Sequence, residues 1–178
     1  MKMPEQKTSN PMSSIYLNKL VLNIGIGNSE DKYDSAKSLL NKLTGKTVMQ
    51  TRARTREPAF GIKKDQIIGA VVTLRKSEAN DMLKRALEAN GSMIQPTSIT
   101  NNSLSFGVKE YIYFSGVKYD PKIGMLGLNV NAYFSRKGMR VGLRKRKNSS
   151  ASKKHKTIDY EEMLSYLQKN YGVKLSQT

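Results

Sequence analysis

Alternating apolar and polar residues mark the first predicted strand, Ile15 to Ile26. The even-numbered positions from 20 to 26 are apolar, whereas the odd-numbered ones include Lys19 and Asn23. Successive side chains of a strand point to opposite faces, so this pattern predicts a strand with one buried face. Lys19 and Asn23 are then expected together on the other face.

The same patterns predict the remaining elements. Period-two segments indicate strands at about 47–53, 67–75, 104–108 with an extension to 114, and 126–134. Apolar stripes at helical spacing indicate helices over about 33–43, 79–87 and 158–170, each followed by a glycine. Three N-terminal signals are expected: Ser29 with Glu30 and Asp31, Ser77, and a capping box from Asp159 to Glu162. We therefore predict an α+β fold: a mostly antiparallel sheet with helices packed on one face.

Two basic segments interrupt these patterns and define the expected domain organisation. A long loop, 54–66, lies between two strands, and a basic C-terminal tract, 136–156, holds ten Lys or Arg and no acid. We expect a flexible N-terminal arm over 1–14, a single domain over 15–172 that includes the tract and the last helix, and a C-terminal tail over 173–178.

The charge of the chain narrows the possible partners. Lys and Arg number 31 and Asp and Glu 14, which gives a formal net charge of +17 and favours a polyanion: RNA, DNA or an anionic membrane surface. No apolar run approaches the roughly 20 residues of a membrane helix, and residues 1–14 lack the apolar stretch of a secretory signal. The sequence thus indicates a soluble, intracellular, basic protein.

Signals for enzymatic chemistry are weak. Cysteine is absent and histidine occurs once, which excludes disulfide frameworks, cysteine metal sites and paired-histidine catalysis. Gly25-Ile26-Gly27 lacks the third glycine of a dinucleotide-binding loop, because position 30 is Glu. His155 lies in a basic run without an orienting carboxylate, and the acids form no clustered pair. We expect no catalytic residue, no metal, no cofactor, no small-molecule substrate and no membrane partner.

Three groups of residues are candidates for nucleic-acid binding. Thr73 and Arg75 lie opposite the apolar positions of their strand, as Lys19 and Asn23 do, so one sheet face would present donors suited to phosphates and 2′-hydroxyls. An ordinary solvated face is the alternative. The loop offers Arg54, Arg56, Phe60, Gly61, Lys63 and Lys64, and the alternative there is a mobile loop whose Phe tucks inward. The tract offers Arg136, Lys137, Arg140, Arg144, Lys145, Arg146, Lys147, Lys153, Lys154 and Lys156, and such a segment is often disordered until a polyanion neutralises it.

Seven blocks in register resemble one known family. They are YLNKLVLNIGIG (16–27), LLNKLTGKTVMQTRAR (39–54), FGIKK (60–64), IGAVVTLR (68–75), LKRALEA (83–89), SFGVKEY (105–111) and GVKYDPKIGMLGLNV (116–130). Together they are similar to the universal large-subunit ribosomal protein numbered five, in its archaeal and eukaryotic form. The resemblance covers about residues 12–175.

The resemblance implies a non-enzymatic, ribosome-bound, cytoplasmic protein of the central protuberance that supports translation. Family members anchor 5S rRNA to large-subunit rRNA, and the positions that face 5S rRNA correspond to Lys19, Asn23 and Thr73, with Lys46 where the family often has Gln. The family's long loop, here 54–66, reaches toward peptidyl-site tRNA, and members also touch a small-subunit head protein. A free RNA chaperone, an RNA-modifying enzyme and a membrane-surface protein remain the alternatives.

Overall fold

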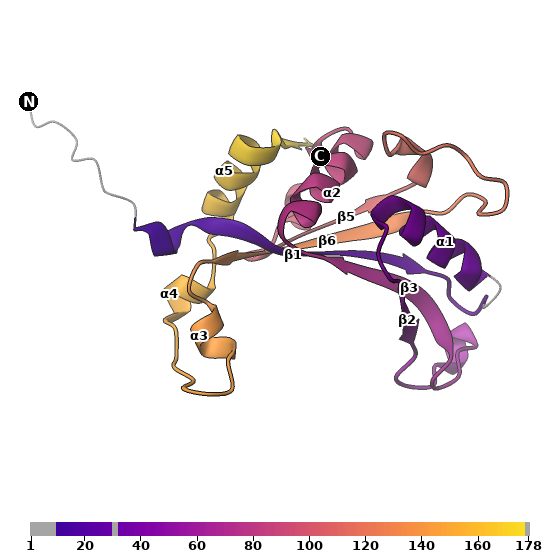
Figure 1. Ribbon diagram of the computed structural model, residues 1–178, viewed down its shortest axis with the longest axis horizontal. Coiled ribbons are helices and arrows are strands. Elements are labelled where there is room, and N and C mark those ends of the chain that lie inside the picture. Colours follow the sequence, from indigo (N-terminus) through magenta and orange to yellow (C-terminus); the bar gives the residue numbers. More distant parts are fainter. Residues whose placement is uncertain (1–9, 30–31, 177–178) are drawn as a thin grey trace, which may run out of the picture.

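A five-stranded sheet forms the centre of the computed structural model, which describes residues 10–29 and 32–176 (Figure 1). The strands are β1 (Ile15–Gly25), β2 (Met49–Arg52), β3 (Ile67–Leu74), β5 (Ser103–Val108) and β6 (Leu128–Arg136). Their order across the sheet is β2-β3-β1-β6-β5, and every neighbouring pair is antiparallel. The expected α+β class with an antiparallel sheet is confirmed.

Three helices cover one face of this sheet: α1 (Lys32–Thr44), α2 (Lys76–Ala89) and α5 (Tyr160–Tyr171) (Figure 1). The apolar stripes that predict these helices pack against the alternate apolar residues of the strands in one core. Leu22 of β1, Leu39 of α1 and Leu83 of α2 are among its fully buried side chains. Burying one such side chain stabilises the fold by about 1.5–3 kcal/mol, so this layer fixes which sheet face remains uncovered.

The C-terminal segment differs from the expected tail. Gly172, in the left-handed conformation with φ 65°, ends α5 and turns the chain back toward α2. Val173 is buried, and β7 (Lys174–Leu175) pairs in parallel with β4 (Met93–Ile94). Only two residues pair on each strand, too few for an alternation that the sequence could reveal. Residues 177–178 of the expected tail, like 1–9 of the expected arm, lie outside the described residues.

Several element boundaries also differ from the predictions. The fifth strand ends at Val108, because a 3-10 turn at Tyr111–Tyr113 follows and buries Tyr111 instead of continuing the alternation. Helix α2 begins at Lys76, so Arg75 rather than Ser77 precedes it. Asp159 precedes α5 as predicted but makes no capping bond with its side chain. The prediction for Ser29 rests on Glu30 and Asp31, which lie outside the described residues.

Candidate nucleic-acid interface

The uncovered sheet face carries the first group of predicted site residues. On β1, Lys19 and Asn23 alternate with the buried Leu20, Leu22 and Ile24. Thr73 of β3 lies directly opposite Val21 of β1. Side chains of directly opposed residues project from the same face. The prediction that Lys19, Asn23 and Thr73 share the face away from the helices is therefore correct as geometry.

Arg75 and Lys46 lie at one border of this face rather than on it. β3 ends at Leu74, and Arg75 is the exposed residue that precedes α2. The ammonium group of Lys46 lies 2.7 Å from a carboxylate oxygen of Glu78. Lys46, Thr73 and Arg75 line one shallow pocket of about 350 Å³, which Glu78 also lines. Because both members of the Lys46–Glu78 pair are about half exposed, the pair contributes at most about 1 kcal/mol. It is therefore weak enough for a phosphate to displace Glu78.

Strand β6 adds residues to this face that the sequence analysis missed. Asn129 lies directly opposite Asn23, and Tyr133 lies directly opposite Lys19. The ammonium nitrogen of Lys19 is 5.8 Å from the centroid of the Tyr133 ring, a cation–π geometry worth about 0.5–1 kcal/mol at an exposed site. The polar residues that alternate with the apolar ones over 126–134 could have indicated them, but the prediction for this strand used only the apolar residues. That β6 lies beside β1 emerges only from the fold.

The loop between β2 and β3 is held at its base by short backbone and side-chain contacts. Ala53 donates to Gln66 O at 2.9 Å, and Asp65 donates back to Ala53 O at 2.9 Å. The side-chain amide of Gln66 donates to Asn28 Oδ1 at 2.6 Å, while Gln66 Oε1 accepts from Lys63 N at 2.9 Å. These contacts fix the loop to the turn after β1.

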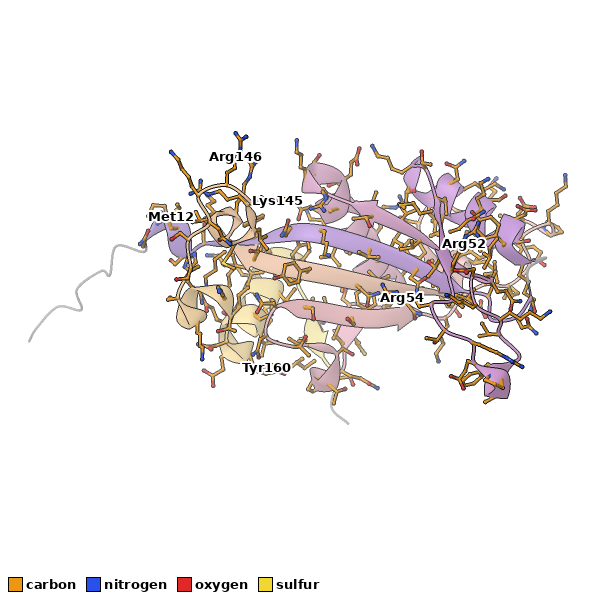
Figure 2. All side chains as sticks on the ribbon, turned by 90° about the horizontal axis from the view of Figure 1, so that it is seen from below. Met12, Arg52, Arg54, Lys145, Arg146 and Tyr160 are labelled. Carbon is orange, nitrogen blue, oxygen red and sulfur yellow. The ribbon has the colours of Figure 1, made fainter. Side chains whose placement is uncertain are left out.

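The loop exposes the side chains that make it a candidate. Phe60 ends a 3-10 turn, Pro58–Phe60, and its side chain is 72% exposed, so it does not tuck inward. Gly61, with φ 66°, turns the chain after it. The four cations predicted for this loop are all exposed: Arg54, Arg56, Lys63 and Lys64. Arg52 of β2 is also exposed, and it lies at the same end of the sheet as Arg54 (Figure 2).

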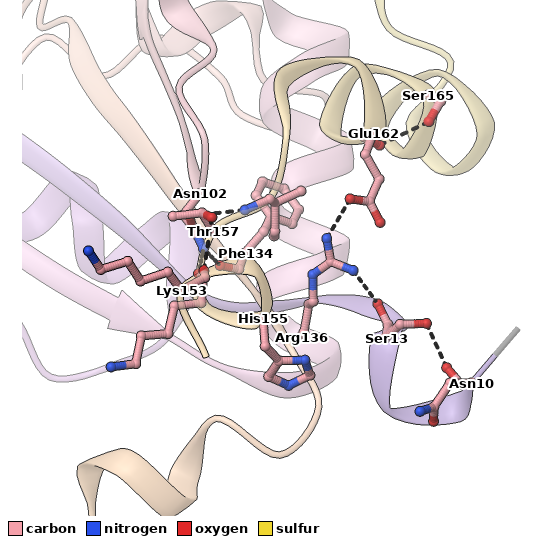
Figure 3. Close-up of polar contacts among 12 residues, drawn as sticks. Asn10, Ser13, Asn102, Phe134, Arg136, Lys153, His155, Thr157, Glu162 and Ser165 are labelled. Carbon is pink, nitrogen blue, oxygen red and sulfur yellow. Dashed lines mark hydrogen bonds and ion pairs between the residues drawn. The ribbon is translucent and has the colours of Figure 1, made fainter. Parts of the chain in front are cut away.

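Arg136 differs from the rest of the basic tract. It ends β6, and its guanidinium lies 2.5 Å from a carboxylate oxygen of Glu162 on α5 and donates to Ser13 O at 3.4 Å (Figure 3). Its side chain is only 13% exposed. The structure thus gives Arg136 an internal partner that joins β6, α5 and the segment before β1. Phosphate binding by Arg136 stays a prediction that this pairing disfavours.

The rest of the tract extends away from the sheet and is closed at its base. It contains α3 (Arg140–Leu143) and α4 (Lys153–Lys156). His155 Nε2 lies 2.9 Å from Lys137 O, and the side-chain amide of Asn102 donates to Lys156 O at 3.0 Å. His155 thus contacts a backbone oxygen instead of a carboxylate. The exposed cations of this segment are Lys137, Arg140, Arg144, Lys145, Arg146, Lys147, Lys153 and Lys156.

Charge is placed at both ends of the uncovered face. The β2–β3 loop and the α3–α4 segment project on the side of the sheet opposite α1, α2 and α5 (Figure 1). Seen from that side, Lys145 and Arg146 lie at one end of the sheet and Arg52 and Arg54 at the other (Figure 2). Within the described ranges, no three His, Asp or Glu side chains gather as a metal site, and no helix is long and apolar enough to cross a membrane. A hydrogen-bonding face between two cationic ends is the arrangement typical of the class of basic nucleic-acid-binding proteins.

Comparison with known proteins gives the particular family. The family model described as "Ribosomal protein L5" matches residues 10–63, and the model for the C-terminus of the same ribosomal family matches residues 67–167. The protein named "Large ribosomal subunit protein uL5" from Pyrobaculum aerophilum is 40% identical over 166 residues, which cover 93% of this chain and 92% of that protein. The proteins of the same name from Sulfurisphaera tokodaii and Nitrosopumilus maritimus are each 37% identical, over 96% and 94% of this chain and 97% of either relative.

The chain belongs to the ribosomal protein L5 family. It is a non-enzymatic structural constituent of the large ribosomal subunit, and its partners are ribosomal RNA and other ribosomal proteins. The two family matches meet inside one sheet, because β1 from the first match is hydrogen-bonded on both sides to β3 and β6 from the second. The resemblance stated from the seven sequence blocks is thereby confirmed.

Proposed function

We propose that this protein binds 5S rRNA with its uncovered sheet face and anchors it to large-subunit rRNA in the central protuberance of cytoplasmic ribosomes. The observation that carries the proposal is the position of Lys19, Asn23 and Thr73 on one face, away from the helices. These are the positions to which the resemblance assigns contact with 5S rRNA. Their amide, hydroxyl and ammonium groups suit the hydroxyls and phosphates of an RNA backbone.

The two basic projections take complementary roles in this proposal. The loop 54–66 meets peptidyl-site tRNA, with the exposed Phe60 packing on a ribose or base and its cations near phosphates. The exposed cations of 137–156 neutralise phosphates of large-subunit rRNA. A small-subunit head protein is a further proposed partner, with no residues assigned to that contact. The rigid base of the loop supports its role, since a fixed loop loses less conformational entropy on binding.

The sheet-face assignment is tested by the double variant Asn23→Ala/Thr73→Ala. Each lost hydrogen bond costs about 1 kcal/mol, so the pair should bind 5S rRNA roughly 10- to 30-fold more weakly at matched salt. The control is Ser38→Ala/Asn41→Ala, which changes two exposed polar residues of α1 on the covered side. Electrophoretic mobility shift or fluorescence anisotropy gives both affinities, and circular dichroism verifies that both variants fold. Equal affinity of the wild type and Asn23→Ala/Thr73→Ala would refute the assignment.

A further inference from the structure

The uncovered face continues beyond the residues assigned to 5S rRNA onto two further strands, β6 and β5, whose side chains on this face include uncharged polar groups. Cross-strand pairing arranges it in rows. One row runs from Val71 through Asn23 and Asn129 to Gly107. The next runs from Thr73 through Val21 and Asn131 to Ser105, and the third from Lys19 through Tyr133 to Ser103. Neighbouring strands lie about 4.8 Å apart, so β6 and β5 extend this face by two strand spacings, about 10 Å.

The amides of this face are available to a ligand. Asn28, Asn90 and Asn102 each make a side-chain hydrogen bond that secures a turn or a strand end. In contrast, over the residues that the structure describes, the side chains of Asn23, Asn129 and Asn131 have no hydrogen-bond partner within the protein. Asn129 is exposed and Asn131 half-buried, in a sheet region whose opposite face is packed core. The polarity of these two positions therefore has no role in the interior of the fold.

Space and charge around these amides indicate what they bind. Gly107, directly opposite Asn129, has no side chain to cover it, and a Cβ there would lie 3.4 Å from Asn129 Oδ1. Lys19 is the one cation among the described residues of the three rows, and its ammonium nitrogen lies over the ring of Tyr133, the residue directly opposite on β6. A neutral amide both donates and accepts, and so matches the 2′-hydroxyl of ribose, which does the same. In double-helical RNA these hydroxyls line the wide, shallow minor groove.

We propose that Asn129 and Asn131 form a ribose-recognition column that makes this face selective for RNA over DNA. The proposal rests on the proposed function, because it assigns the two amides to the same bound RNA as Asn23 and Thr73. It separates two roles by position: the cationic ends of the face supply salt-dependent attraction, and the neutral column distinguishes ribose from deoxyribose. The column should therefore add RNA affinity without adding to the salt dependence of binding.

The test compares two double variants of the full chain that match in shape. Asn129→Val/Asn131→Val removes the hydrogen-bonding groups, whereas Asn129→Thr/Asn131→Thr keeps a hydroxyl on a side chain of the same branching, and all four side chains suit a strand. The probes are 5S rRNA and a DNA of the same sequence, each titrated over a range of salt. We expect the valine pair to bind 5S rRNA roughly 10- to 30-fold more weakly than wild type, with an unchanged salt slope and unchanged binding to the DNA. The threonine pair should recover most of that loss.

Three results would overturn the proposal. Equal RNA affinity of the valine pair and wild type, while Asn23→Ala/Thr73→Ala is weakened, would show that the column is not used and would leave the proposed function intact. Equal losses for RNA and DNA would show that the amides do not read ribose. Failure of the wild type to bind 5S rRNA would refute the proposed function and this inference with it.

Discussion

The salt dependence of RNA binding should depend on the α3–α4 segment far more than on other exposed cations. The perturbation is a fourfold replacement, Arg140→Gln, Lys145→Gln, Arg146→Gln and Lys153→Gln. These side chains are exposed and take no part in the hydrogen bonds that close the base of the segment. Deleting 144–156 would instead remove the contacts of His155 and Lys156 that position the segment. Substitution therefore isolates the charge from the shape.

The magnitude follows from the number of charges. Each phosphate contact contributes about 0.7–0.9 to the slope of log affinity against log salt, so four lost contacts lower the slope by about 2.8–3.6. At about 0.1 M salt, the lower value corresponds to several hundredfold weaker binding. The control replaces four lysines that are exposed on the helix-covered side by Gln: Lys37, Lys84, Lys169 and Lys174. Both variants lower the formal net charge of +17 by four, so they lose the same charge at different places on the molecule.

The assay is fluorescence anisotropy with large-subunit rRNA fragments over a series of KCl concentrations, on variants whose thermal unfolding is first compared with wild type. We expect a large decrease of the slope for the α3–α4 variant and a small one for the helix-side variant. Equal slopes for the two variants would refute the reasoning, because only total charge and not its placement would then govern binding.

Two further predictions concern ion pairs between elements of the fold, one largely buried and one at the surface. Glu162→Ala leaves the largely buried guanidinium of Arg136 without its carboxylate, so the free energy of unfolding in urea should fall by about 1–3 kcal/mol. The control, Glu161→Ala on the exposed side of α5, should change this free energy little, and equal losses for the two variants would contradict the prediction. The hydrogen bond from the Lys42 side chain lowers the pKa of Asp120 below 3.8, so the pair stabilises the fold above that pH and loses its effect as the pH falls through the lowered pKa. Asp120→Asn should therefore show a smaller loss of stability than wild type as the pH falls from about 5 to 2 in thermal unfolding; identical pH profiles would contradict it.

Local periodicity was sufficient to predict part of the candidate site. Which face of a strand a residue occupies depends only on its parity relative to the apolar residues of that strand, which is why Lys19, Asn23 and Thr73 could be placed together. The same rule could have placed Asn129 and Asn131, since Leu128 and Val130 alternate with them. It could not predict that Asn129 faces Asn23, because strand order depends on packing between segments about 100 residues apart.

A charge run conceals differences between its members. In the sequence, Arg136 is one of ten similar cations, but Glu162, 26 residues further on, pairs with it in the folded chain and removes it from the exposed set. Lys46 likewise pairs with Glu78 from the next helix. The sequence does not reveal either pair. Each acid lies in the first turn of a helix, where an acid is expected anyway because it offsets the helix dipole. Tertiary structure thus decides which charges are free to meet RNA.

The placement of charge, more than its total, explains how one small sheet could serve both affinity and selectivity. A face covered with lysine would bind any polyanion, and its attraction would weaken steeply as salt increases. Here Lys145 and Arg146 stand at one end of the sheet and Arg52 and Arg54 at the other (Figure 2). Asn23, Thr73, Asn129 and Asn131 lie in the paired rows of the face, where Lys19 is the one cation among the described residues. Phosphates held at the ends would bring a ribose within reach of the neutral amides, and only an RNA of the right shape could satisfy both. The uncharged residues of this basic chain are therefore where we expect its selectivity to reside.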